Sequence, residues 1–346
     1  MYEISITAND ASRRLDKFLF AYFNNAPHSL IYKLLRKKRI KLNGKRAGGA
    51  ELLADGDAIG LYLAQETMDS LRAECNLSSA PSSTGSAKSP LGDLSLPEIV
   101  FEDANLLIIN KPAGMPSHGG MKNKNPHLLS RVLHYLRETG AYPPNATFTP
   151  ALCNRLDVNT SGLVICGKTY QAIRAINALF ATPGSVDKEY LAVVDGELHG
   201  SATLEGHYQK DSVTNMAKIT NTVANALNGL TTDTSHHTTS AQAKSLAITQ
   251  YTSLSIANSH TLLSVNPVTG RSHQIRAHLA AIGHPLSGDK KYGGMPIPGA
   301  TGQLLHCKKL KLPLMESLPY PKGITWTADP PASFKKRLND WFGGQQ

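Results

Sequence analysis

The feature that most constrains the fold is a low-complexity stretch in the first third of the chain. Residues 69–95 include L-S-S-A-P-S-S-T-G-S-A-K-S-P, which is rich in Ser and Pro and nearly free of aromatic side chains. A segment of this composition behaves as a flexible coil, because it has little apolar surface to bury. We therefore expect residues 65–96 to be a flexible linker between an N-terminal domain of residues 1–64 and a larger domain of residues 97–330.

Two further segments interrupt or follow the larger domain. Residues 221–244 are rich in Thr, Ser, Asn and Ala and contain two adjacent histidines, so we expect an inserted loop there. Residues 331–346 are expected to form a C-terminal extension. The 346 residues are 41% hydrophobic, which is enough to build two folded domains on either side of the linker.

The composition argues against several protein classes. No apolar run approaches the roughly 18 residues that a membrane span needs, so no membrane partner is expected. The first ten residues lack the charged-then-apolar pattern of a signal peptide. Four scattered cysteines contain no C-x-x-C pair, which disfavours a zinc ribbon or a disulfide framework. We expect reduced thiols in a cytoplasmic protein.

Positive charge is concentrated near the N-terminus. The chain has a formal net charge of +10, and residues 1–64 hold 11 Lys or Arg against 6 Asp or Glu. The span from Lys33 to Arg46 contains eight basic residues and no acidic one, which favours a nucleic-acid partner over a merely solvated face. The candidate RNA-contacting residues here are Lys33, Arg36, Lys37, Lys38, Arg39 and Lys41.

Hydrophobic periodicity predicts a mixture of helices and strands in both domains. In the N-terminal domain we expect helices over 12–23 and from Ser29, then a hairpin at Asn43-Gly44 and a closing strand. In the larger domain we expect helices over 128–138 and 170–180, and a turn leading into a helix over 269–283. Strands are expected at 99–111, 162–166, 188–194 and 245–266.

One stretch offers two rival chemistries. Residues 162–169, G-L-V-I-C-G-K-T, match the phosphate-loop pattern G-x-x-x-x-G-K-[ST]. A phosphate loop exposes its backbone, whereas the intervening residues here are apolar and would lose roughly 1.5–3 kcal/mol each by staying exposed. We therefore interpret the run as a buried strand. Asp195, which ends an apolar strand, could bind magnesium in the nucleotide-binding alternative.

The other half of that stretch carries Arg155 and Asp157. In an extended chain both project from one face, with Asp157 at the boundary of a V-N-T-S-G turn. By itself Asp157 could be a structural turn residue or an ion-pair partner of Arg155. Downstream, T-G-R-S-H-Q-I-R-A-H suits an anion-lined cleft. Its candidate residues are Arg271, His273, Gln274, Arg276 and His278. The i, i+5 spacing of the histidines, without a neighbouring carboxylate, disfavours a metal site.

These blocks resemble the RluA-type pseudouridine synthases over residues 97–322. The similarity rests on N-K-P-A-G-M-P-S-H (110–118), N-R-L-D-V-N-T-S-G-L (154–163), K-E-Y-L-A-V-V-D-G (188–196), the long block from T-G-R-S-H-Q-I-R (269–276) to G-D-K-K-Y-G-G (288–294), and L-L-H-C-K-K-L (304–310). The first 64 residues resemble the S-four-type RNA-binding domain often attached to these enzymes. One position departs from the family pattern, which commonly has His where this chain has Asn154.

The resemblance implies an α+β fold and a catalytic aspartate. A small α/β RNA-binding domain would be joined to a catalytic domain with a mixed, mainly antiparallel central sheet flanked by helices and loops. The enzyme would isomerise uridine in RNA to pseudouridine without cofactor or metal, with Asp157 acting on the sugar or the base. Arg276 would pair with Asp157, and Tyr190 would stack on the uracil and help to move its C5 proton. The target base would have to leave its stack to reach the cleft.

Other assignments follow less directly from the same resemblance. Arg155 and Arg271 are expected to contact phosphates or the cleft, with His273 and Gln274 beside them, while Lys111 and His118 belong to structural or RNA-edge loops. A structured large-subunit ribosomal RNA fits a separate anchoring domain better than a tRNA, and the protein is expected to be monomeric. The alternatives are a tRNA-directed synthase, a non-catalytic RNA-binding or ribosome-assembly module, and a nucleotide hydrolase that depends on Lys168.

Overall fold

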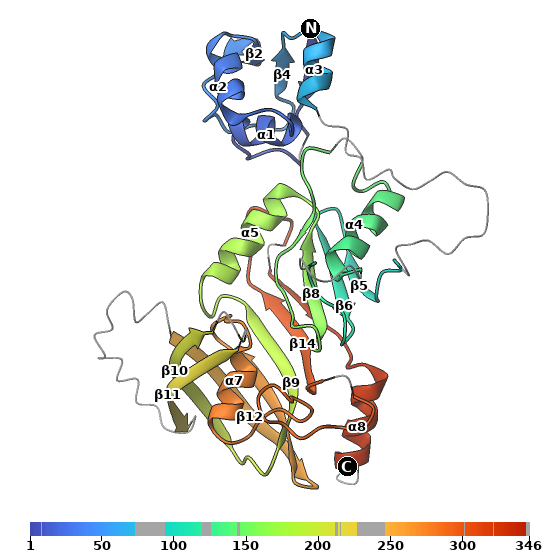
Figure 1. The fold of residues 1–346 in the computed structure, drawn as a ribbon, viewed down its shortest axis with the longest axis vertical. Coiled ribbons are helices and arrows are strands. Elements are labelled where there is room, and N and C mark those ends of the chain that lie inside the picture. Colours follow the sequence, from blue (N-terminus) through green and yellow to red (C-terminus); the bar gives the residue numbers. More distant parts are fainter. Residues whose placement is uncertain are drawn as a thin grey trace, which may run out of the picture.

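The computed structural model describes residues 1–7, 9–72, 94–119, 126–143, 146–211, 214, 216–226, 246–300, 302–320 and 322–343. A small N-terminal unit lies at one end of the molecule and a larger unit makes up the rest (Figure 1). Among the helices of these residues, none combines the length and apolar character needed to cross a membrane.

The N-terminal unit is a four-stranded antiparallel sheet packed against three helices. Its sheet has the order β1-β4-β2-β3, and its core includes Leu15, Phe18 and Ile31, which are almost completely buried. The elements are β1 (Tyr2–Ser5), α1 (Leu15–Tyr22), α2 (His28–Arg36), β2 (Ile40–Leu42), β3 (Lys45–Arg46), β4 (Ala58–Leu61) and α3 (Gln65–Leu71). The predicted helix pair and the hairpin at Asn43-Gly44 are both confirmed.

Helix α3 corrects the predicted boundary of this unit. Met68 and Leu71 are buried in the N-terminal core, and Arg72 lies over the ring of Tyr22 at 4.4 Å. Residues 65–71 therefore belong to the folded unit, because burying these two apolar side chains stabilises the helix that carries them. The predicted linker begins too early at residue 65, and its segment 73–93 lies outside the described residues.

The larger unit is built on one extensive sheet. Its strands run in the order β11-β10-β12-β13-β9-β14-β8-β6-β5, with β15 attached to β14 and β7 attached to β8. The elements are β5 (Ile99–Glu102), β6 (Leu106–Lys111), α4 (Leu128–Glu138), β7 (Ala151–Leu152), β8 (Ser161–Gly167), α5 (Tyr170–Ala181), β9 (Asp187–Asp195), β10 (Ser201–Lys210), β11 (Ala217–Ala226), β12 (Leu246–Ala257), β13 (His260–Pro267), α7 (Gln274–Ala281), β14 (Leu305–Leu312), β15 (Ile324–Thr327) and α8 (Ala332–Phe342).

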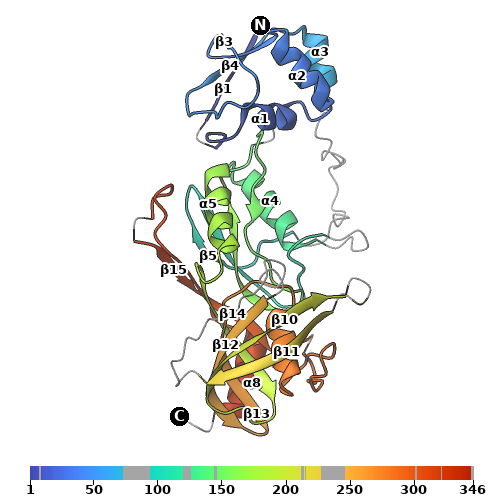
Figure 2. The same cartoon turned by 90° about the vertical axis from the view of Figure 1, so that its left-hand side faces the viewer.

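The strand pairing confirms the expected fold class. Of the described strand pairs, β14 with β8 is parallel and the others are antiparallel, which makes the sheet mixed but mainly antiparallel. The turned view shows the hairpins of β10 to β13 at the end of the molecule away from the N-terminal unit (Figure 2). Helix α7 packs on this end through Ile275, Ala277 and Leu279. The α+β architecture therefore places α7 against the β10 to β13 end of the sheet.

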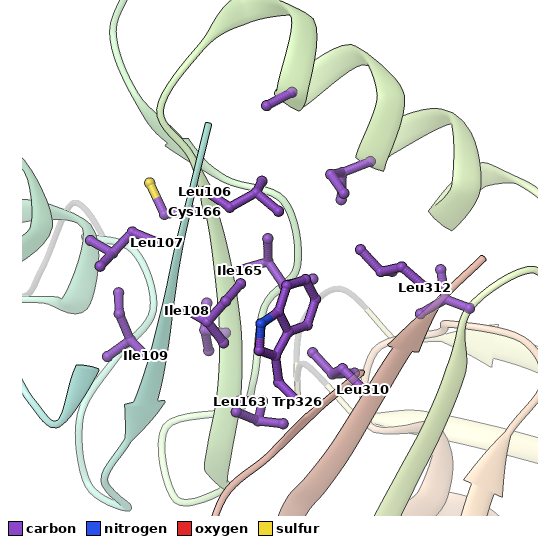
Figure 3. Packing of buried hydrophobic residues seen from close by; sticks show 14 of the residues in the cluster. Leu106, Leu107, Ile108, Ile109, Leu163, Ile165, Cys166, Leu310, Leu312 and Trp326 are labelled. Atoms are coloured by element: carbon purple, nitrogen blue, oxygen red, sulfur yellow. The ribbon is translucent and has the colours of Figure 1, made fainter. Parts of the chain in front are cut away.

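Strand β8 is the buried strand that the apolar run predicts. All seven of its residues are buried, and Leu163 and Ile165 pack near Trp326 and Leu310 in the largest core (Figure 3). Gly162 has a φ of 115°, and a Cβ at that position would lie 2.3 Å from the backbone oxygen of Cys307. A glycine is needed there for the close approach of β14, so the first glycine of the phosphate-loop pattern has a packing explanation.

Two predicted segments differ from the structure at their boundaries. Residues 221–226 continue β11 instead of starting an inserted loop, and they pair with β10 from Val223 to Ala226. The rest of the predicted insertion, 227–244, lies outside the described residues. The C-terminal extension forms α8, whose Phe334 and Phe342 pack against Leu191 of β9. The larger domain therefore continues past the predicted end at residue 330.

Candidate active site

Asp157 lies in the loop that joins β7 to β8. Leu156 is buried, whereas Arg155 is exposed and the side chain of Asp157 is 24% exposed. This alternation is what an extended segment produces, since successive side chains point to opposite sides. The predicted common face of Arg155 and Asp157 is therefore found, and it opens into a cleft.

Side chains from other segments hold this loop in place. The hydroxyl of Ser117 donates to the Leu156 carbonyl at 2.8 Å and accepts from the Leu156 amide at 3.2 Å. The amino group of Lys111, which is completely buried, donates to the carbonyls of Val158, Met115 and Pro112 at 3.1, 2.8 and 2.9 Å. The loop around Asp157 is thus fixed on both sides of the carboxylate.

Lys111 was expected to belong to a structural loop or to an RNA-edge loop, and its contacts give it the structural role. Burial lowers the pKa of its amino group to about 7, with the charge of Asp157 acting in the opposite direction. Three carbonyl acceptors match the three N–H donors of an ammonium group, which favours the charged form. A buried ammonium at this position ties the loop to the end of β6.

Arg276 connects Asp157 to a second carboxylate. Its Nη1 donates to Asp157 Oδ2 at 3.0 Å, while Nε and Nη2 donate to the two oxygens of Asp289 at 2.7 and 2.8 Å. Arg276 and Asp289 are 7% and 2% exposed. The buried bidentate pair fixes the plane of the guanidinium and leaves one edge for Asp157. The predicted pairing of Arg276 with Asp157 is present in the geometry.

His273 and Tyr292 complete the wall around Asp157. His273 precedes α7 with a left-handed φ of 57°, which turns its ring toward the loop. Its Nε2 lies 3.8 Å from Asp157 Oδ2, and its Nδ1 lies 3.0 Å from the Tyr292 hydroxyl. Burial lowers the pKa of His273 more than Asp157 raises it, so the ring is neutral at neutral pH. The guanidinium of Arg276 stacks over Tyr292 at 4.9 Å.

Tyr190 reaches the same cleft from the centre of the sheet. It lies on β9, where it pairs with Val265 on one side and Cys307 on the other. Burial raises the pKa of its phenol well above the ordinary value, helped by contact with Cys307 and by the charge of Asp157. Tyr190 therefore presents a rigid ring and a hydroxyl that stays protonated at physiological pH.

The cleft brings together most of the candidate residues of the larger unit; His278 instead is completely buried on α7, where its Nδ1 lies 2.8 Å from the Thr249 hydroxyl. Its volume is about 290 Å³, near the lower end of the range for small-ligand pockets. The predicted residues along its wall are Arg155, Asp157, Tyr190, Arg271, His273, Gln274 and Arg276. A second hollow of about 660 Å³ shares Arg155 and Asp157 and adds the basic side chains of His118, Lys290 and Lys291. Asp157 therefore lies where the two hollows meet.

Gln274 differs from the expectation of an RNA contact. Its Oε1 accepts from the Thr269 hydroxyl and the Arg271 amide, and its Nε2 donates to Ile248 and Thr249, all at 2.7 to 3.0 Å. The residue is 3% exposed. Because these internal bonds occupy its amide group, Gln274 stabilises the turn before α7 instead of presenting an amide to a ligand.

The basic N-terminal residues are not part of the cleft. Lys33, Arg36 and Lys37 are exposed on or just after α2, and the remaining candidates Lys38, Arg39 and Lys41 follow toward β2. The two units contact each other where Arg13 Nη1 donates to the Thr147 carbonyl at 3.0 Å. The basic surface therefore forms a second, separate region of positive charge.

The residues of the nucleotide-binding alternative have other partners. Lys168 Nζ donates to Glu102 and to the Asp103 carbonyl, both at 2.7 Å. Asp195 accepts from the Ser287 hydroxyl and the Met295 amide. Within the part of the chain that the structure describes, no group of three or more His, Cys, Asp or Glu residues could hold a metal ion. Lys168 and Asp195, which suggested a nucleotide site, therefore hold neighbouring segments of the fold together.

Several residues of the site escaped the sequence reasoning. Asp289 and Tyr292 lie in the G-D-K-K-Y-G-G run, whose family resemblance alone assigns no role to either residue. Lys188 also lines the cleft, and burial lowers its pKa. The sequence signal for Asp289 was an acidic residue next to two lysines. Its ion-pair partner, Arg276, could be identified only from the folded geometry.

Comparison with known proteins places the chain among RNA-modifying enzymes. A family model described as RNA pseudouridylate synthase matches residues 105–281. The ribosomal large subunit pseudouridine synthase C of Vibrio vulnificus (strain CMCP6) is 30% identical over 301 residues, which cover 87% of this chain and 82% of the relative. The protein of the same name from Escherichia coli (strain K12) is 30% identical over 291 residues, with 84% and 79% coverage.

One solved structure supports the same fold. The structure of human RNA pseudouridylate synthase domain containing 1 matches with a TM-score of 0.52 and 19% identity, covering 72% of this chain and 89% of that one. At this level of identity the match shows a shared fold.

Proposed function

The chain belongs to the RNA pseudouridylate synthase family and isomerises uridine in RNA, and we propose that its substrate is large-subunit ribosomal RNA and its catalytic group Asp157. The assignment of Asp157 as the catalytic group is supported by its position. Asp157 is fixed in a loop, paired with Arg276 and open to a cleft. The substrate class is supported by the names of the relatives, which act on the large ribosomal subunit.

The reaction exchanges one glycosidic bond for another. The bond between uracil N1 and ribose C1′ breaks, the base turns over, and a bond forms between C5 and C1′. The proton on C5 leaves and N1 gains one, so the product is an isomer of the substrate. A carboxylate nucleophile requires a defined orientation, and the guanidinium of Arg276 supplies it at 3.0 Å.

Tyr190 and the surrounding cations have supporting roles in this proposal. The phenol ring of Tyr190 offers a stacking surface for a uracil that has left its helix. Its raised pKa suits a hydrogen-bond donor and disfavours a phenolate acting as a base in the free enzyme. Arg155 and Arg271, which are both exposed at the cleft, are placed to meet phosphates of the RNA.

The N-terminal unit is proposed to be the S-four-like RNA-binding domain. Its exposed basic residues would add a second contact to a large RNA, which raises the effective concentration of substrate at the cleft. A ribosomal RNA offers room for two separated contacts, and this argument favours it over a tRNA. We also propose that the enzyme acts as a monomer in the cytoplasm.

Mapping pseudouridine in total RNA tests the substrate. Cells that lack the gene should lose pseudouridine at one or more positions of large-subunit ribosomal RNA. A plasmid copy should restore it, and a copy carrying Asp157→Ala should not. Loss of pseudouridine in tRNA alone would replace the proposed substrate. An unchanged map of all cellular RNA would favour a non-catalytic RNA-binding role.

A further inference from the structure

Asn154 is the position where this chain departs from the pattern of the enzymes that it resembles. It lies three residues before Asp157 and lines the same cleft. Its side chain makes two hydrogen bonds to the backbone of β8. Its Nδ2 donates to the Leu163 carbonyl at 3.2 Å, and its Oδ1 accepts from the Ile165 amide at 2.8 Å.

These two bonds fill a gap on one edge of β8. At one end of that edge, β7 pairs Leu152 with Cys166, and the Cys153 amide donates to the Ile165 carbonyl at 2.8 Å. At the other end, β14 pairs Cys307 with Gly162. The chain leaves β8 between these two points to form the Asp157 loop.

The Asn154 carboxamide replaces the missing backbone at this junction. One acceptor and one donor of its side chain take the place that a peptide group of a paired strand would occupy. The backbone of Asn154 is thereby released to turn toward the cleft while its side chain stays attached to the rigid sheet. The next attachment is the Ser117 hydroxyl, two residues further along at Leu156.

We propose that Asn154 is a positioning residue, which sets the orientation of Asp157 by anchoring the start of its loop to β8. The proposal rests on the proposed function of Asp157 as the reacting carboxylate. Without the two bonds, the last attachment to β8 before Leu156 is the Cys153 amide, so the chain from Asn154 onward loses its side-chain anchor to the sheet. A displacement of about 1 Å at a reacting group lowers a rate by roughly 100-fold.

The direct test is Asn154→Ala in the full-length enzyme. The single-turnover rate of tritium release from RNA labelled at uracil C5 should fall about 10- to 100-fold, while the dissociation constant for the RNA stays within about 2-fold. Asn110→Ala is the matched control, because Asn110 in neighbouring β6 also donates twice, to Glu98 and to the Asp329 carbonyl. It should leave both the rate and the affinity within about 2-fold.

A histidine at this position gives a second readout. A neutral imidazole has one donor and one acceptor nitrogen, as the carboxamide does, whereas the protonated ring has two donors. Asn154→His should therefore recover much of the rate at pH 8 and lose it as the pH falls through the pKa of the ring. The wild-type enzyme has no titrating group at this position. The ratio of the variant rate to the wild-type rate at each pH therefore reports the protonation of the introduced imidazole alone.

The outcomes separate this proposal from the proposed function. An Asn154→Ala enzyme that keeps the wild-type rate, or that loses affinity and rate in parallel, overturns the positioning role while catalysis by the wild type stands. An Asn154→His enzyme whose ratio to wild type does not change with pH overturns the donor and acceptor argument. A wild-type enzyme without tritium release on any RNA overturns the proposed function itself.

Discussion

Arg276 has two carboxylate partners, Asp289 and Asp157. Replacing each of them with alanine should show that Asp289 contributes mainly to stability and Asp157 mainly to activity. Three N–H donors of Arg276 are used, two by Asp289 and one by Asp157. Because Arg276 and Asp289 are both buried, Asp289→Ala leaves a buried guanidinium with two donors unpaired. Breaking a buried ion pair in this way costs about 3–5 kcal/mol of the free energy of unfolding.

Asp157→Ala should cost much less stability. It removes one hydrogen bond, and the Asp157 side chain is about a quarter exposed, so water can reach the donor that is left. We expect a loss of about 1 kcal/mol. The order of the two variants should be reversed for activity, since Asp157→Ala abolishes the reaction whereas Asp289→Ala lowers the rate through the orientation of Arg276.

Urea unfolding followed by tryptophan fluorescence measures the stability difference. Both tryptophans of the chain, Trp326 and Trp341, belong to the larger unit, so their emission reports on the domain that carries the pair. The reasoning is refuted if Asp289→Ala lies within about 1 kcal/mol of the wild type, or if Asp157→Ala proves the more damaging of the two for stability.

Three other expectations concern groups outside the reaction centre. Burial lowers the pKa of His278 to about 4, below the ordinary unfolded value near 6.5, so the stability from keeping it neutral is complete above about pH 6.5 and is lost as the pH falls toward 4. The free energy of unfolding lost over this pH range is roughly 3 kcal/mol. Urea unfolding at several pH values should therefore show a smaller loss of stability on acidification for His278→Gln than for the wild type. Lys168→Ala should keep the tritium-release rate within about 2-fold, because Lys168 pairs with Glu102; magnesium-dependent nucleotide hydrolysis by the wild type that is lost in Lys168→Ala would support the nucleotide-binding alternative. Replacing Arg36 and Lys37 by alanine should weaken RNA binding and reduce the slope of log affinity against log salt by about one per lost phosphate contact, with the rate at saturating RNA unchanged.

Sequence periodicity was enough to predict the local elements. The helix over 128–138 and the buried strand at 162–166 are found within a residue of their expected bounds, because caps and apolar patterns act locally. Helix α3 was not predicted, because its seven residues run into the low-complexity stretch and its buried core residues are only Met68 and Leu71. The last residues of β11, 221–226, were assigned to a loop for a related reason, since their Thr, Asn and Ala composition is typical of a loop and pairing with β10 decides the outcome.

The site was predictable only in part. The blocks around Asp157 and Arg276 identified two residues that lie 119 positions apart and meet at 3.0 Å. The buried partner Asp289 and the anchoring role of Asn154 depend on contacts between distant segments, which one sequence does not reveal. Gln274 was misread because a polar residue beside a reactive cleft can serve either the ligand or the turn, and burial distinguishes the two.

The central claim is that Asp157 carries the reaction in a cleft that binds RNA independently of it. Single-turnover tritium release from C5-labelled ribosomal RNA, measured for wild type and Asp157→Asn alongside RNA affinity, tests this claim most directly. We predict release by the wild type, release at background for Asp157→Asn, and affinities within a few-fold of each other. Substantial release by Asp157→Asn would contradict the assignment of the catalytic group.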